Sequence, residues 1–290
     1  MSFFCYGLAK DHEMDYSCLF GCGIGSFPLK YLGIPMTHRR LRNSEWQCVI
    51  DRFEKRLAMW KGKLLSSGGR LVLINSVLSS LPIFMMSFFE VPIGVLKKLD
   101  AIRSRFYWQN GQFKKKYRLA KWNIICQPKE VGGLGVANLA TKNICLLSKW
   151  LFKLLNQDGT WQQLLKNKYL GSKSLTQAVR KSGDSHFWAG LMNIKEEFLR
   201  WGRFRVGDGH ATRFWNDRWI LDRPLKVIYP NLFNIVRKRN ALVKDVMNGN
   251  LPNLSFRRAI VGVKRVEWHN LSTLLASIPL GHSKDKFLWG

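Results

Sequence analysis

A run of apolar residues at helical spacing is the feature that most constrains the fold. Between residues 44 and 60, apolar side chains recur every three or four positions, the period of one α-helical face. The stripe comprises Trp46, Val49, Ile50, Phe53, Leu57 and Trp60. Ser44 with Gln47 fits a capping box at the helix start, and the turn at 66–69 is predicted to end the helix. One face of this helix must be buried against other elements.

Similar spacing predicts further helices along the chain. They cover residues 71–81, a stretch starting near Pro92, and residues 138–156, 160–170 and 184–200. Residues 1–36 read as short strands and turns, with a strand near residue 31 stopped by Pro35. Residues 204–215 predict a hairpin that turns at Asp208-Gly209. The expected fold class is mainly α with short β hairpins, an α+β chain.

The net charge indicates a polyanionic partner. The chain has 47 Lys and Arg against 19 Asp and Glu, a formal net charge of +28, and its 46% hydrophobic content is enough to bury a core. Such an excess repels itself in the folded state unless an anion offsets it. Nucleic acid is the leading candidate and an anionic membrane surface the second. A basic protein without a specific partner is the plainest alternative.

A basic and aromatic segment is the best candidate for nucleic-acid contact. Residues 97–121 hold nine cations against one acid, Asp100, and include the aromatic run 106–108. Cations suit phosphates, and exposed rings can stack on bases, although the rings could equally be core. The predicted contact residues are Lys61, Lys63, Arg70, Arg103, Arg105, Trp108, Lys114, Lys115, Lys116, Arg118 and Lys121.

A spanning helix and a secretory signal are both disfavoured. Residues 71–89 carry no charge and have about the length of a transmembrane helix. Polar residues cluster in the first half and Pro82 interrupts the stretch, which favours a buried core helix broken near the proline. The N-terminus lacks the pattern of a signal peptide, and the six cysteines form no disulfide framework. We therefore expect an intracellular protein, nuclear or cytosolic, with no membrane partner.

Motifs for metal binding and catalysis are weak. Cys18 and Cys22 have a metal-compatible spacing that Cys5 and His12 could complete, but no second paired half exists. Two-metal polymerase chemistry needs paired carboxylates, and the chain has no Asp-Asp dipeptide. Asp208 and Asp217 are interpreted as structural. The neighbours at 184–186, Asp-Ser-His, suit a helix cap better than a catalytic triad. We predict no catalytic residue, metal site or cofactor.

An ordered set of short segments carries a family resemblance. The segments are Lys30–Met36, Trp60–Ser66, Gly68–Ile74, Lys121-Trp122, Gly132–Gly135 and Thr212–Trp215, which together span nearly the whole chain. In this order they resemble the reverse transcriptase, an RNA-directed DNA polymerase, of plant LINE-type (non-LTR) retrotransposons. In that family a palm domain carries a Tyr/Phe-Ala-Asp-Asp motif shortly before the Lys-Tyr-Leu-Gly segment. This chain is expected to start just after that motif.

The resemblance implies four segments along the chain. Residues 1–36 would be the end of the palm with a primer-grip-like hairpin at Tyr31, Leu32 and Gly33. A thumb-like helical bundle at 37–125 would be followed by a helical connection domain with a hairpin at 126–222. Residues 223–290 are expected to form a looser linker, and a zinc-binding-type segment and any ribonuclease H domain would lie beyond it.

The expected function follows from both arguments. We expect a non-catalytic reverse-transcriptase fragment that binds RNA, DNA or an RNA–DNA template–primer through basic helices, with the missing palm domain as a further partner. A thumb holds such a duplex by its phosphates, independently of sequence. The alternative is a decayed or host-adopted nucleic-acid-binding or interaction protein with no enzymatic role.

Overall fold

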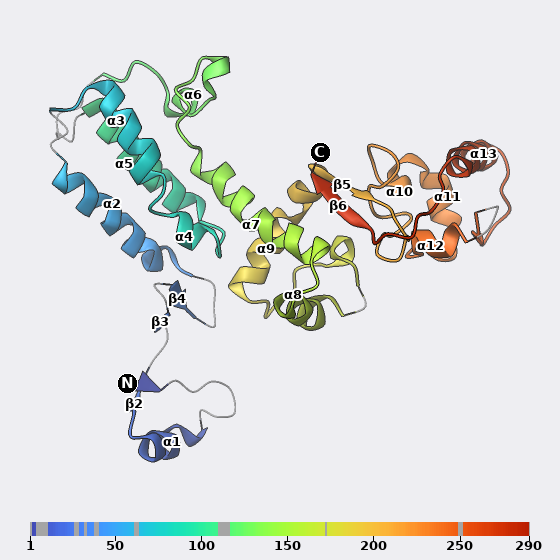
Figure 1. Cartoon of the computed structure of the whole chain (residues 1–290), viewed down its shortest axis with the longest axis horizontal. Helices are drawn as coiled ribbons and strands as arrows, with labels where there is room; N and C mark the ends of the chain where they lie inside the picture. The colour runs from blue at the N-terminus through green and yellow to red at the C-terminus, as the bar shows by residue number, and fades with distance from the viewer. Residues whose placement is uncertain are drawn as a thin grey trace. The chain divides into compact units, whose positions relative to one another are not determined.

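The computed structural model describes residues 2–3, 11–25, 29–31, 34–37, 41–60, 64–109, 117–171, 173–248 and 252–289. Over these ranges the chain is mainly helical, with three two-stranded sheets, which confirms the predicted fold class. Two compact units divide it. The first unit comprises Met1–Leu147 and Ser182–Gly190, and the second comprises Ser148–Lys181 and Leu191–Gly290 (Figure 1).

Helices form the core of the first unit. α2 (Gln47–Met59) and α3 (Ser67–Leu73) both pack against α5 (Ile93–Gln109), with α4 (Ile83–Met86) between α3 and α5 in the sequence (Figure 1). Trp46, Val49, Ile50 and Phe53 are buried, so the predicted apolar stripe is confirmed. Burying each large side chain of this kind contributes roughly 1.5–3 kcal/mol, which makes the stripe the main stabilising feature of α2.

The predicted helix ends near α2 and α3 were wrong. The Glu45 carboxylate accepts the backbone N–H of Arg42, so a 3-10 turn at Asn43–Trp46 precedes α2 and no box forms between Ser44 and Gln47. Ser66 does not end a helix but caps α3, because its Oγ accepts the Gly69 N–H at 3.1 Å. A π-helical turn at Ile74–Leu78 then continues α3.

Short strands occupy the N-terminal part of the first unit. β1 (Ser2–Phe3) pairs in parallel with β2 (Gly23–Ile24), and α1 (Glu13–Phe20) lies between them in the sequence. β3 (Leu29–Tyr31) and β4 (Ile34–Met36) pair antiparallel, with Tyr31 opposite Ile34. Leu32 and Gly33 of the predicted primer-grip-like hairpin lie outside the described residues.

A glycine-rich loop follows α6 (Trp122–Ile125). Gly132 and Gly135 have positive φ, a conformation that side chains disfavour. At Gly133 an added Cβ would meet the Gln127 carbonyl oxygen at 2.0 Å. The interpretation that this loop lets chain segments pack closely is therefore confirmed.

Two long helices contribute residues to both units. α7 (Leu139–Asn156) and α9 (His186–Arg200) correspond closely to predicted helices. Ser185 caps α9 by accepting the Trp188 N–H at 3.2 Å, and His186 accepts the Leu41 N–H through Nδ1. The Asp-Ser-His run at 184–186 is thus part of the structure, as the sequence indicated. α8 (Thr160–Leu165) lies between these helices in the sequence.

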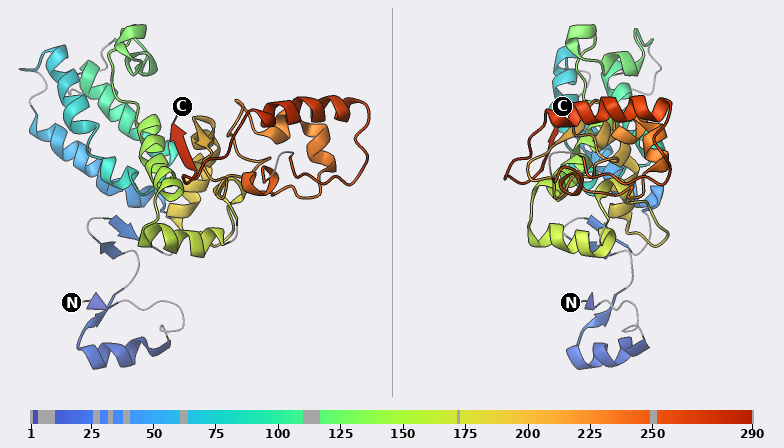
Figure 2. Two further views of the ribbon diagram at one scale, coloured as in Figure 1. Left: turned by 45° about the vertical axis from the view of Figure 1, so that its right-hand side comes forward. Right: turned by 90° about the vertical axis from the view of Figure 1, so that its right-hand side faces the viewer.

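The second unit is folded beyond residue 222, where the sequence had predicted a looser linker. α10 (Leu225–Ile228), α11 (Pro230–Ile235), α12 (Val243–Val246) and α13 (Val263–Ala276) occupy this segment. α11 packs against α13 (Figure 2), and the Glu267 carboxylate accepts the Leu232 N–H in the first turn of α11. A carboxylate at this end offsets the helix dipole. The predicted four-segment division stays a prediction, since the two compact units divide within α7.

The hairpin predicted at 204–215 was wrong. β5 (Gly202–Arg205) pairs antiparallel with β6 (Lys286–Trp289), far away in the sequence. Asp285 explains why: its carboxylate accepts N–H groups from Gly207, Gly209, Ala211 and Thr212 at 2.7–3.0 Å. Those donors are then not available to a returning strand. Although burial acts to raise it, these hydrogen bonds hold the pKa of Asp285 below its usual value.

Among the helices in the described ranges, none joins the length and the apolar composition that crossing a bilayer requires. The predicted core helix broken near Pro82 is confirmed, since Pro82 lies between the π-helical turn and α4.

Candidate nucleic-acid interface

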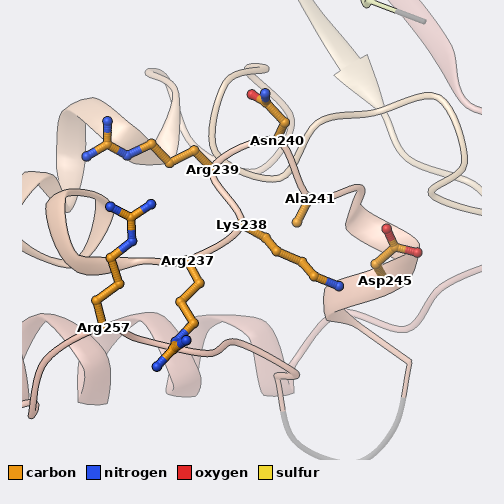
Figure 3. A pocket seen from close by; sticks show the side chains of 7 residues that line it. All are labelled: Arg237, Lys238, Arg239, Asn240, Ala241, Asp245 and Arg257. Carbon is orange, nitrogen blue, oxygen red and sulfur yellow. The ribbon is translucent and has the colours of Figure 1, made fainter.

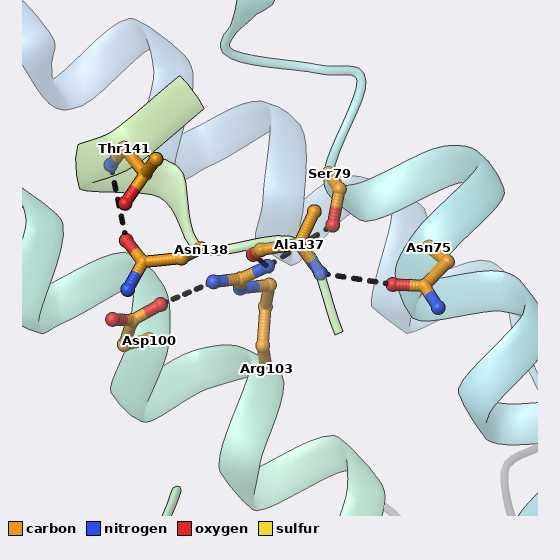
Figure 4. Close-up of polar contacts among 7 residues, drawn as sticks. All are labelled: Asn75, Ser79, Asp100, Arg103, Ala137, Asn138 and Thr141. Carbon is orange, nitrogen blue, oxygen red and sulfur yellow. Dashed lines mark hydrogen bonds and ion pairs between the residues drawn. The ribbon is translucent and has the colours of Figure 1, made fainter. Parts of the chain in front are cut away.

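Arg103, one of the predicted contact residues, lies inside the first unit. Its side chain is 0% exposed. The guanidinium pairs with Asp100 and donates to Ser79 Oγ at 3.0 Å and to the Ala137 carbonyl oxygen at 2.8 Å (Figure 4). It also lies over the Trp122 ring, 5.6 Å from the centroid. Phosphates cannot reach this guanidinium, so we remove Arg103 from the predicted contact set.

The other predicted contact residues divide into three groups. Arg70 is 8% exposed and donates to Ser67 Oγ, and Trp108 is half-buried with its ring edge-on to Tyr107. Arg105, Arg118 and Lys121 are exposed. Lys61, Lys63, Lys114, Lys115 and Lys116 lie outside the described residues, as does the side chain of Tyr31. Only the exposed group remains available for phosphate contact within the described ranges.

The second unit contains a basic pocket that the sequence prediction missed. The pocket encloses about 440 Å³ and is lined by Arg237, Lys238, Arg239, Asn240, Ala241, Asp245 and Arg257. All four cations are exposed, and Asp245 is the only acid in the lining. Figure 3 shows the guanidinium groups of Arg239 and Arg257 on one side and Asp245 on the other. This arrangement leaves a net positive charge around one open concavity.

Backbone pairing brings these cations together. Val236 and Phe256 form an isolated antiparallel bridge. Beside it, the Arg237 N–H donates to the Ser255 carbonyl oxygen at 2.9 Å, and the Arg257 N–H donates to that of Ile235 at 2.7 Å. The bridge therefore places Arg257 beside the cationic run 237–239, which α13 alone would not achieve.

Side chains from the preceding loop fix the turn of the basic pocket. Arg213 donates to the Asn240 carbonyl oxygen at 2.6 Å, and Asn216 donates to that of Arg239 at 3.1 Å. The Arg239 guanidinium lies 5.2 Å from the centroid of the Phe233 ring. Because the backbone is held from one side, binding an anion would require ordering the side chains but not the loop.

The charges of the basic pocket are not neutralised by the protein. Within the described residues, none of its four cations forms an ion pair with an acidic side chain. Like charges held this close repel one another, and an anion at the centre would relieve the repulsion. Arginine forks suit the paired oxygens of phosphate groups. The pocket is therefore suited chemically to phosphate.

A second group of cations lies on the β5–β6 ribbon. Phe204 and Phe287 face the core, while Arg203, Arg205 and Lys286 are exposed. The register places Arg205 directly opposite Lys286. Like charges opposite one another destabilise a strand pair, so this ribbon face would also gain from an anionic partner.

One part of this interface was visible in the sequence and the other was not. The run Arg237-Lys238-Arg239 can be read from the sequence directly. The approach of Arg257, and that of Lys286 to Arg205, depends on pairings between distant segments. Within the described ranges, no group of three or more His, Cys, Asp or Glu side chains could hold a metal ion, and Cys5 of the weak cysteine site lies outside them.

Comparison with known proteins identifies two relatives in Arabidopsis thaliana, and no family model matches the chain. The chain is 34% identical over 199 residues to the putative ribonuclease H protein At1g65750, covering 66% of this chain and 32% of that protein. It is 32% identical over 145 residues to the uncharacterized mitochondrial protein AtMg00310, covering 49% of this chain and 94% of that protein. The chain thus spans about a third of the length of the former.

Proposed function

The chain belongs to the family of the uncharacterized mitochondrial protein AtMg00310, and from this premise we propose that it is a retroelement-derived protein that binds nucleic acid. Its similarity to a protein named as a putative ribonuclease H supports this proposal, because enzymes of that name act on nucleic acid. The ordered segments that resemble plant LINE-type reverse transcriptases point the same way. Under this proposal the chain corresponds to the part of the polymerase that follows the catalytic palm.

The proposed binding mode is contact with phosphates, independent of sequence. The observation that carries it is the basic pocket, with four exposed cations and one acid around about 440 Å³. The exposed Arg105, Arg118 and Lys121 would add contacts from the first unit. Phosphate contacts position a protein on RNA, DNA or a hybrid duplex without reading bases.

Binding to labelled oligonucleotides tests the proposal. The triple variant Arg237→Ala/Arg239→Ala/Arg257→Ala should bind RNA, DNA and RNA–DNA duplexes about 10- to 100-fold more weakly in fluorescence anisotropy at low salt. The matched control is Arg52→Ala/Lys55→Ala/Arg56→Ala, which removes the same charge from exposed positions of α2. Asp51 and Glu54 share that segment, so the control should lose less affinity. Equal losses in the two variants would contradict a role for the pocket.

We also propose that this chain alone does not polymerise nucleotides. It contains no Asp-Asp dipeptide, the usual source of the paired carboxylates that hold two catalytic metal ions. A primer-extension assay with template, primer, magnesium and deoxynucleotides should therefore show no incorporation. Incorporation by the purified chain would refute this part of the proposal while leaving the binding proposal intact.

A further inference from the structure

A small cavity in the second unit has polar and apolar walls. It encloses about 200 Å³ between the end of α7, the 170–176 segment and the loop that carries Asp217. Its apolar wall includes Leu154, Leu155, Leu170 and Phe204. Typical small-molecule pockets enclose roughly 300–1,000 Å³, so this cavity has room for a single ring system rather than an extended ligand.

Asp217 places an unpaired acceptor at this cavity. The side chain is 2% exposed. Its Oδ2 accepts the Arg213 N–H at 2.7 Å, whereas its Oδ1 is buried without a hydrogen bond. Buried carboxylate oxygens are rarely left without donors, because their desolvation is then not offset. The cavity therefore contains a position where an N–H group of a ligand would be stabilised.

The protonation of Asp217 fits a donor ligand at neutral pH. Burial raises the pKa of Asp217 to about 6, against the opposing effects of the Arg213 N–H and the Thr176 side chain. The carboxyl is thus mostly ionised at pH 7 and offers acceptors alone. Lys173 lines the cavity and is exposed, whereas Lys166 is engaged by Asp158 at 3.0 Å. Lys173 is therefore the cation available for an attached phosphate.

We propose that this cavity takes one unpaired nucleobase whose amino group donates to Oδ1 of Asp217, with the adjoining phosphate against Lys173. The apolar leucines would contact the faces of the ring. This inference rests on the proposed function and sharpens it, since it adds a site for an unstacked base to phosphate contacts elsewhere. Adenine, cytosine and guanine carry an amino group. Uracil does not, and the carbonyl oxygens on both sides of its N–H would repel the carboxylate.

Calorimetric titration of the full chain with mononucleotides tests the site. Cytidine monophosphate should bind about tenfold or more tightly than uridine monophosphate, because a hydrogen bond to an ionised partner is gained. Inorganic phosphate should bind no better than the uridine nucleotide. Equal affinity for the three probes, or no saturable binding of cytidine monophosphate, would overturn the proposal without any variant being needed.

Two variants assign the preference to the cavity. Asp217→Asn should reduce the cytidine over uridine preference about fivefold or more, with a thermal melt confirming that the protein is folded. Lys173→Ala should weaken both nucleotides alike. If Asp217→Asn is folded and keeps the full preference, the assignment to this cavity is wrong.

The basic-pocket variant separates this inference from the proposed function. Arg237→Ala/Arg239→Ala/Arg257→Ala should keep the cytidine preference, because those residues do not line the cavity. Unchanged oligonucleotide affinity in that variant, together with a persisting cytidine preference, would refute the phosphate proposal and support the cavity. Weakened oligonucleotide affinity with no preference among mononucleotides would do the reverse.

Discussion

Arg103 in the first unit and the basic pocket in the second use the same residue types in opposite ways. Arg103 is enclosed, and Asp100, Ser79 and the Ala137 carbonyl accept its donors. The four pocket cations are exposed and unpaired with acids within the described residues. The first charge is satisfied by the protein, and the second group is left for a ligand.

The difference teaches that counting charges along a sequence does not locate a binding surface. Residues 97–121 had the denser run of cations, yet its central arginine is structural. The pocket draws on a shorter run, completed by Arg257 from another segment. Whether a cation binds a partner depends on whether the fold supplies an acceptor for it.

Replacing Arg103 gives the largest expected effect. Arg103→Met should lower the free energy of unfolding by about 3 to 5 kcal/mol, because Asp100, Ser79 and the Ala137 carbonyl lose a buried donor. Urea denaturation measures this. Arg105→Met, an exposed position two residues away on α5, is the control and should change stability by no more than about 0.5 kcal/mol. Similar midpoints for the two variants would break the comparison.

Asp217 extends the comparison to a buried charge that is only partly satisfied. Its folded pKa of about 6 lies above the usual 3.8, so folding favours the protonated form. Stability from this group is fully present below about pH 4 and is lost as the pH rises through about 6. Relative to wild type, Asp217→Asn should gain about 3 kcal/mol in unfolding free energy between about pH 4 and pH 7.5. Parallel stability profiles would contradict this environment for Asp217.

Removing the acid of the basic pocket should sharpen its contrast with Arg103. Asp245→Asn deletes the single negative charge in the lining. The variant should bind oligonucleotides roughly two- to fivefold more tightly at low salt, with unchanged thermal stability. Asp51→Asn, an exposed acid on α2, serves as the matched control. Weaker binding by Asp245→Asn would mean that the acid contributes to the site in another way.

The ribbon carries the smallest expected effect. Lys286→Ala removes the like charge opposite Arg205, so the free protein should gain a few tenths of a kcal/mol in stability. The same change should weaken oligonucleotide binding a fewfold, since one cation is lost. A loss of stability on this substitution would show that Lys286 is satisfied by the protein, as Arg103 is.

Helices with a strong apolar period could be predicted from the sequence. The stripe of α2 and the extents of α5, α7 and α9 were recognisable because helical periodicity is local. Helix ends were less accurate, since Ser66 can either end one helix or cap the next. Only the structure distinguishes these roles.

Pairings between distant segments could not be predicted. Asp208-Gly209 carries a strong turn signal, but Asp285 takes up the N–H groups of that loop from the far end of the chain. Likewise the residues around Arg237 meet those around Arg257 through backbone pairing. The burial of Arg103 did have a local signal, since Asp100 lies one helical turn before it.

The salt dependence of oligonucleotide binding tests the central claim most directly. Fluorescence anisotropy across roughly 50–200 mM salt gives the slope of log affinity against log salt, which falls by about 0.7–0.9 for each phosphate contact removed. Arg237→Ala/Arg239→Ala/Arg257→Ala should reduce the magnitude of this slope by about two to three relative to wild type. An unchanged slope in a folded triple variant would contradict the claim that these open cations hold nucleic-acid phosphates.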